Sequence, residues 1–139
     1  AARLDGAGVS YSFFYLAGSS GAGRGREGAA RSAEVFNRTR PKRVGSSMLT
    51  VFPNSALYRE IQTGNWREES ELEKLEEVRT LIESLSIPTR FETAGASNLV
   101  HIRGDLPEDR ARLSESLTRL MDGTDEEALR AYRVTLRHL

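Results

Sequence analysis

Hydrophobic and polar positions along the chain switch between a strand pattern and a helix pattern, and each switch predicts an element. Val9–Leu16 is apolar, β-branched or aromatic at most positions and ends at Gly18. This pattern predicts a strand covered on both faces. A glycine-rich loop follows, and a helix is expected from about Glu27 until Pro41 ends it.

The same order recurs downstream. Arg43–Phe52 reads as a second strand, and Ser55 can cap a short helix through Ile61. The clearest helix is Ser70–Leu85, where Leu, Val and Ile recur at helical spacing and Ser70 and Glu73 have the spacing of a capping box. We interpret its charged residues as a solvated face.

A third strand is expected at Thr89–Thr93, a helix at about 107–121, and a last helix capped by Thr124 with Glu127. The resulting order β–α–β–α–α–β–α–α predicts an α/β fold with a parallel sheet. Such sheets bind ligands at the carboxyl ends of their strands. These ends are residues 18–28, 50–54 and 94–98.

The first of these ends is the glycine loop, which has five glycines between residues 18 and 28. Backbone N–H groups at the start of the following helix would stabilise an anion there, and Arg24, Arg26 and Arg31 would add positive charge. The alternative is a sharp turn whose glycines only relieve strain and bind no ligand.

Known phosphate and catalytic motifs fit poorly. Gly23–Gly28 matches G-x-G-x-x-G, but the loop is long and no Asp or Glu lies between Glu34 and Glu60 to hold a ribose. No Gly-Lys-Ser/Thr follows a glycine loop, and no G-x-S-x-G occurs. His101 and His138 have no partner at metal-ligand spacing.

Composition narrows the function classes. The 139 residues carry 20 Lys and Arg against 20 Asp and Glu, so no overall field favours nucleic acid or an acidic membrane. Cysteine is absent, which excludes disulfides and cysteine-ligated metals within the chain. With no transmembrane-length run or signal pattern, a cytoplasmic location is expected. The opening AARLDGAGVS reads like the end of a helix, which indicates a piece of a longer protein.

Segments at the predicted strand ends resemble a known family. They are YLAGSSGAGRGREGAARSAEVFNRTRP, SSMLTVFPNSALYREIQTGNW, GASN and GDLPEDRARL. They resemble the carboxyl-terminal half of radical S-adenosylmethionine (SAM) enzymes, in the Fe–S oxidoreductase group related to the anaerobic coproporphyrinogen III oxidases and the Elongator catalytic subunit. The resemblance covers about residues 1–121. In this family a partial (β/α)₆ TIM-like barrel carries a [4Fe–4S] cluster on a C-x-x-x-C-x-x-C loop, and the reduced cluster cleaves SAM to a radical that abstracts hydrogen from the substrate.

The resemblance implies roles for particular residues. Val9–Leu16 and Arg43–Val51 would be the last two barrel strands, and residues 69–139 an α-rich extension with one short strand. Ala22 stands where the family has an acid, and Glu27 follows several residues later. The implied cofactor-binding residues are Gly18, Gly23, Gly25, Glu27, Thr50 and Pro53, with Asn98 on the substrate side.

The sequence therefore predicts a cytoplasmic fragment, residues 1–68 and 69–139, of a radical SAM oxidoreductase that acts on a small-molecule substrate. The absent amino-terminal half would carry the [4Fe–4S] cluster, so this fragment alone would be inactive. An unpaired barrel strand would invite self-association. The alternatives are a stand-alone α/β domain that binds an anionic ligand without catalysis, and an interaction domain that uses the Ser70–Leu85 helix.

Overall fold

Alternating burial along the strands separates the sheet into a covered face and an open face. The computed structural model describes residues 1–93 and 95–136, so His138 lies outside the described residues. In β1 (Ser12–Ala17), Tyr15 and Ala17 are buried, whereas Phe14 and Leu16 are exposed. β3 (Thr89–Thr93) alternates in the same way, whereas in β2 (Arg43–Met48) the three consecutive residues Val44, Gly45 and Ser46 are buried.

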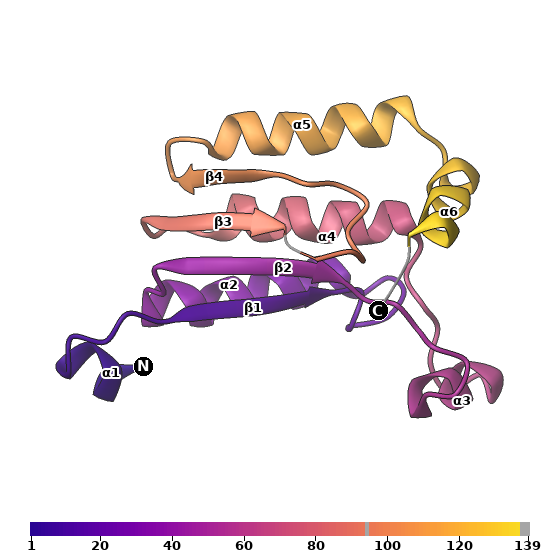
Figure 1. Ribbon diagram of the computed structural model, residues 1–139, viewed down its shortest axis with the longest axis horizontal. Helices are drawn as coiled ribbons and strands as arrows, with labels where there is room; N and C mark the ends of the chain where they lie inside the picture. The colour runs from indigo at the N-terminus through magenta and orange to yellow at the C-terminus, as the bar shows by residue number, and fades with distance from the viewer. Residues whose placement is uncertain (94, 137–139) are drawn as a thin grey trace.

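The sheet has four strands in the order β1-β2-β3-β4. β1, β2 and β3 are parallel, and β4 (Arg103–Leu106) runs antiparallel to β3 (Figure 1). The chain therefore has an α/β fold with a mixed sheet. The expectation of a purely parallel sheet is wrong at β4, because RGDL carries little of the apolar, β-branched character by which strands are recognised.

Among the described residues, helices cover one face of this sheet and leave the other open. In Figure 1, α2 and α4 lie behind the strands, α5 runs beside β4, and α6 lies near the carboxyl ends of the parallel strands. The buried core fills the space between the sheet and these helices, with Phe91, Leu81 and Leu117 among its members. The helices are α1 (Ala2–Gly6), α2 (Gly25–Thr39), α3 (Ala56–Gln62), α4 (Glu71–Ser84), α5 (Arg110–Gly123) and α6 (Glu126–Thr135).

Two sequence expectations need correction beyond β4. β1 is not covered on both faces: Phe14 is 64% exposed and Leu16 is 40% exposed, because no described helix packs on that side. The last helix is capped by Asp125, whose side chain accepts a hydrogen bond from the Ala128 N–H, and not by Thr124. The capping box of Ser70 and Glu73 is confirmed, as is the cap at Ser55.

Candidate functional site

The glycine loop at the carboxyl end of β1 binds carboxylates of α4. Gly18, with a φ of +93°, donates its backbone N–H to Glu77 Oε2 at 2.6 Å. Gly23 donates its backbone N–H to Glu73 Oε1 at 2.9 Å. These N–H groups act on anions as the sequence predicts, but the anions come from the protein itself. An external anion at these donors would have to displace a side chain of α4.

Gly25, a third glycine of this loop, makes room for a pair of buried carboxyl groups. A Cβ at Gly25 would lie 2.6 Å from Glu69 Oε1 and 2.9 Å from Glu77 Oε2, closer than real Cβ atoms approach other atoms. Glu69 is 2% exposed and Glu77 is fully buried. Gly25 therefore allows the first turn of α2 to lie directly against both carboxyl groups.

The two carboxyl groups cannot both hold a charge at low cost. Burial raises the pKa of Glu69 to about 8, and the hydrogen bond and negative charge of Glu77 add to the effect. Glu69 is therefore mainly protonated at neutral pH. The Tyr15 phenol donates to Glu77, and burial together with this contact raises the pKa of Tyr15 above its ordinary value.

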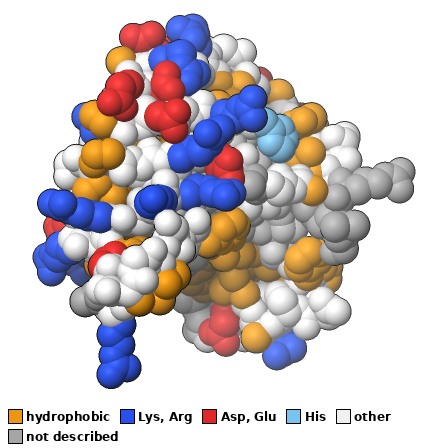
Figure 2. Space-filling view, turned by 60° about the vertical axis from the view of Figure 1, so that its left-hand side comes forward, with side chains coloured by type: hydrophobic (Ala, Val, Ile, Leu, Met, Phe, Trp, Pro, Cys, Tyr) orange, Lys and Arg blue, Asp and Glu red, His pale blue; other side chains and the backbone are white. Residues whose placement is uncertain are grey.

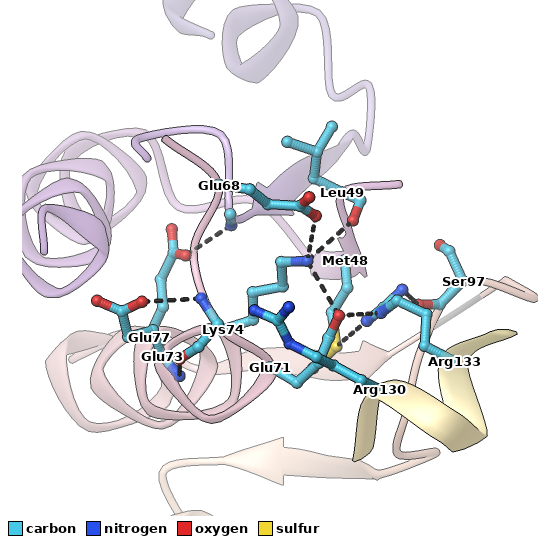
Figure 3. A network of polar contacts seen from close by, with 12 residues as sticks. Met48, Leu49, Glu68, Glu71, Glu73, Lys74, Glu77, Ser97, Arg130 and Arg133 are labelled. Carbon is cyan, nitrogen blue, oxygen red and sulfur yellow. Dashed lines mark hydrogen bonds and ion pairs between the residues drawn. The ribbon is translucent and has the colours of Figure 1, made fainter. Parts of the chain in front are cut away.

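A fully buried lysine joins α4 to the carboxyl end of β2. Lys74 Nζ lies 2.8 Å from Glu68 Oε1, 3.3 Å from Glu71 Oε1 and 3.4 Å from the Leu49 carbonyl oxygen (Figure 3). Its stem passes Gly18, where an added Cβ would lie 3.1 Å from Lys74 Cε. A buried ammonium needs such partners, because water cannot reach it.

Helix α6 completes this network of charges. Arg133 forms an ion pair with Glu71, and it donates to the Ser97 carbonyl oxygen at 2.9 Å (Figure 3). The Glu126 carboxylate accepts the backbone N–H groups of Glu71 and Leu72, both at 3.0 Å. The amino terminus of α4 thus receives a carboxylate from α6, as the helix dipole favours.

These contacts correct the interpretation of the Ser70–Leu85 charges as a solvated face. Lys74 and Glu77 are fully buried, and Glu71 is 4% exposed. A signal was present in the sequence: Glu69, Glu73 and Glu77 recur every fourth residue and continue into Leu81 and Leu85 of the apolar stripe.

Two hollows adjoin at Thr50, beyond the strand ends. The first, of about 390 Å³, is mainly apolar. The second, of about 290 Å³, is charged. Thr50 Oγ1 is buried and has no hydrogen-bond partner among the described residues. The apolar hollow is lined by Leu16, Met48, Leu49, Thr50, Phe52, Ala96 and Ser97, and the charged one by Thr50, Val51, Glu68, Glu69, Glu71, Arg130, Arg133 and Val134.

Of the six predicted cofactor-binding residues, only Thr50 lines these two hollows. Gly23 and Gly25 line a separate hollow of about 400 Å³, together with Arg26, Leu72, Glu73, Glu76 and Met121. The remaining predicted site residues are dispersed. Glu27 is exposed on α2 and pairs with Arg31 at 2.5 Å. Pro53 is exposed in the turn before α3. Asn98 is fully buried, and its amide donates to the Ser46 carbonyl oxygen at 3.3 Å, which ties its loop to β2.

Residues 1–93 and 95–136 contain no group of three or more acidic or histidine side chains arranged to hold a metal ion. None of the helices described there combines the length and hydropathy that crossing a bilayer requires. Comparison with known proteins found no matching family model, no similar curated protein and no similar solved structure.

Proposed function

We propose that this chain forms part of the SAM-binding wall of a radical SAM oxidoreductase. The observation that carries the proposal is the pair of hollows that share Thr50 at the carboxyl ends of β1 and β2. SAM has a flat adenine ring at one end and a zwitterionic amino-acid group at the other. An apolar hollow beside a charged one matches these two ends, and Thr50 Oγ1 offers a buried hydroxyl between them.

The open sheet face supports placing this chain within a larger barrel. Sheets with parallel strands normally have both faces covered, yet Phe14 and Leu16 are exposed on the open face. β1 is also an edge strand, with β2 on one side only. Further barrel strands would pair with β1 and curve over this face, which would then be the inner, substrate-facing wall.

In this proposal SAM binds to this chain, and the [4Fe–4S] cluster binds to the rest of the enzyme. A [4Fe–4S] cluster does not fit the chain, because its 139 residues include no cysteine to ligate iron. SAM fits the paired hollows; one electron from the cluster in the rest of the enzyme would cleave it to methionine and the 5′-deoxyadenosyl radical that abstracts hydrogen from the substrate. The chain's own part is to hold the adenine end against Leu16 and Phe52 and to exclude water from it.

The test uses the complete reading frame that encodes this chain. We expect a C-x-x-x-C-x-x-C segment before residue 1 and, after anaerobic reconstitution, a [4Fe–4S] absorption that SAM perturbs. Thr50→Val should weaken SAM binding about tenfold, the effect of a lost buried hydrogen bond, while Thr50→Ser keeps the hydroxyl and the affinity. A reading frame without the cysteines, or equal SAM affinity in both variants, would contradict the proposal.

The same geometry leads us to propose self-association of the isolated chain through β1. An unpaired, apolar edge strand is a template for a second copy. Sedimentation velocity should show a concentration-dependent dimer that Phe14→Lys shifts to monomer, with Val35→Lys as the control because Val35 is 52% exposed on α2. A monomer at every concentration would show that the edge does not pair.

A further inference from the structure

The open sheet face carries an exposed aromatic ring on its edge strand, β1. Phe14 is 64% exposed. Its neighbour on β2 is Gly45, and a Cβ there would lie 3.3 Å from Phe14 Cδ2. The Phe14 ring therefore lies close beside a position with no side chain. An incoming flat group could contact the ring without competition from a side chain of β2.

Arginines surround this ring on the neighbouring strands. Arg43 lies two residues before Gly45 on β2, and Arg90 on β3 is the register partner of Arg43. Arg103 on β4 is the register partner of Glu92 on β3. Arg43 forms an ion pair with Glu92 at 2.9 Å. Arg90 and Arg103 are exposed, and neither forms an ion pair in the described part of the chain.

Positive charge exceeds negative charge around these strands. Glu92 and Asp105 are the acidic side chains of β3 and β4, and exposed Arg40 and Lys42 precede β2. Figure 2 shows Lys and Arg side chains gathered in a band on this side of the molecule, next to a hollow with hydrophobic side chains. The balanced charge of the whole chain thus conceals a local excess of positive charge.

The spacing between the Phe14 ring and the arginines indicates which chemical groups a ligand of this face would carry. Arg43 is two residues, about 7 Å, from Gly45 along the strand, and Arg90 is about 5 Å farther across the sheet. A ligand that uses both features needs a flat ring and an anionic group a few bonds away. Arginine binds phosphate through paired N–H donors, and bases stack on exposed aromatic rings of sheets.

We infer that the open sheet face binds a phosphorylated nucleotide, with the base on Phe14 and the phosphates on Arg43 and Arg90. The ligand is a free nucleotide, because the ring and the two arginines lie within the reach of a single nucleoside polyphosphate. The inference goes beyond the proposed SAM site, because Phe14, Arg43 and Arg90 do not line the two hollows at Thr50. Either site can therefore fail without the other.

Fluorescence anisotropy with a labelled ATP analogue and with a labelled single-stranded RNA tests the inference. We expect saturable binding of the ATP analogue. ATP should compete at least tenfold better than adenosine, which lacks the charge, and better than tripolyphosphate, which lacks the ring. Stronger competition by ATP than by RNA supports a free nucleotide, and stronger competition by RNA would overturn this assignment.

Variants separate the ring from the charges. Phe14→Ser should weaken binding about tenfold, as loss of one stacked base does, while Phe14→Tyr should retain it. Arg90→Gln should weaken binding and reduce its salt dependence by about one phosphate contact. Tyr132→Ser and Arg119→Gln, which alter exposed residues on α6 and α5, are the controls.

These variants should fold, because Phe14 and Arg90 are exposed, and circular dichroism checks it. Absence of saturable binding by the ATP analogue would overturn the inference. Equal competition by ATP and tripolyphosphate, or an unchanged affinity in Phe14→Ser, would overturn it as well. Binding lost equally in the control variants would show that general charge, rather than the sheet face, attracts the probe.

Discussion

The backbone N–H of Gly18 donates a hydrogen bond to Glu77 Oε2 at 2.6 Å, although 59 positions of sequence separate them. This contact joins the end of β1 to the middle of α4. The Glu77 carboxylate thereby occupies a backbone N–H donor of the loop at which the sequence predicts an external anion.

The first prediction concerns Glu77. Glu77→Ala leaves the Gly18 N–H and the Tyr15 hydroxyl without their acceptor in a buried site, so we expect a loss of about 2–4 kcal/mol in the free energy of unfolding. Glu77→Gln keeps one oxygen and should lose less. Urea unfolding measures both, and Glu115→Ala, whose side chain is 70% exposed, should change stability by less than about 0.5 kcal/mol. Equal losses in the Ala and Gln variants would contradict this account.

The second prediction concerns the buried ammonium of Lys74. Lys74→Met removes the ion-pair partner of Glu68 and one of the two cations on Glu71, the other being Arg133. We therefore expect a loss of about 1.5–3 kcal/mol in the free energy of unfolding, the range for buried hydrogen bonds to charged groups. Adding Glu68→Gln removes the carboxylate that Lys74 neutralised, without affecting the Arg133–Glu71 pair, and should restore part of the loss. The measurement is chemical denaturation of the single and double variants. A double variant less stable than the sum of its parts would rule out this pairing as the cause.

The third prediction follows from the raised pKa of Glu69. In the folded chain the pKa is about 8, above its ordinary value of 4.5, so the folded state retains a proton that the unfolded state releases. The contribution of Glu69 to the free energy of unfolding is therefore fully present below about pH 4.5. It decreases as the pH rises toward 8, by at most about 1.4 kcal/mol per pH unit.

Glu69→Gln tests this pH dependence, because a neutral amide cannot release the proton. We expect the variant to be more stable than the wild type at pH 8, with a smaller difference at pH 5. Thermal melts between these pH values measure the effect. A wild type and a variant with parallel pH profiles would show that Glu69 does not titrate in this range.

The fourth prediction concerns Gly25. Gly25→Ala places a methyl group 2.6 Å from Glu69 Oε1, and we expect a loss of about 1–3 kcal/mol from overpacking. Gly123→Ala is the matched control, since a Cβ there meets nothing within 4 Å and alanine favours a helix. Differential scanning calorimetry should show opposite shifts in melting temperature. An unchanged melting temperature in Gly25→Ala would mean that the Glu69 carboxyl moves aside without cost.

Local signals in the sequence were sufficient for most elements. The Thr89–Thr93 strand has the predicted bounds, and α4 begins one residue after Ser70 because the capping box fixes that end. β4 was missed because its four residues pair only through tertiary contact with β3. Helical and strand periodicity report local burial, and they contain no information about an edge strand of polar composition.

The candidate site was predictable only in part. Glycine content identified the loop that uses its N–H groups, and Thr50 was placed correctly at a strand end, where it lines both hollows. The sequence did not reveal that Glu73 and Glu77 occupy the N–H donors. That outcome depends on how α4 lies across the sheet, and a charged helix face looks the same in sequence whether water or a loop faces it.

The carboxylate that Glu126 provides to the start of α4 has a consequence for biosynthesis. Glu71 emerges from the ribosome 55 residues before Glu126 does. The first N–H groups of nascent α4 therefore lack the Glu126 acceptor until α6 has been synthesised. Until then, Ser70 and Glu73 alone hold that end, and premature termination within α5 would leave it without its last cap.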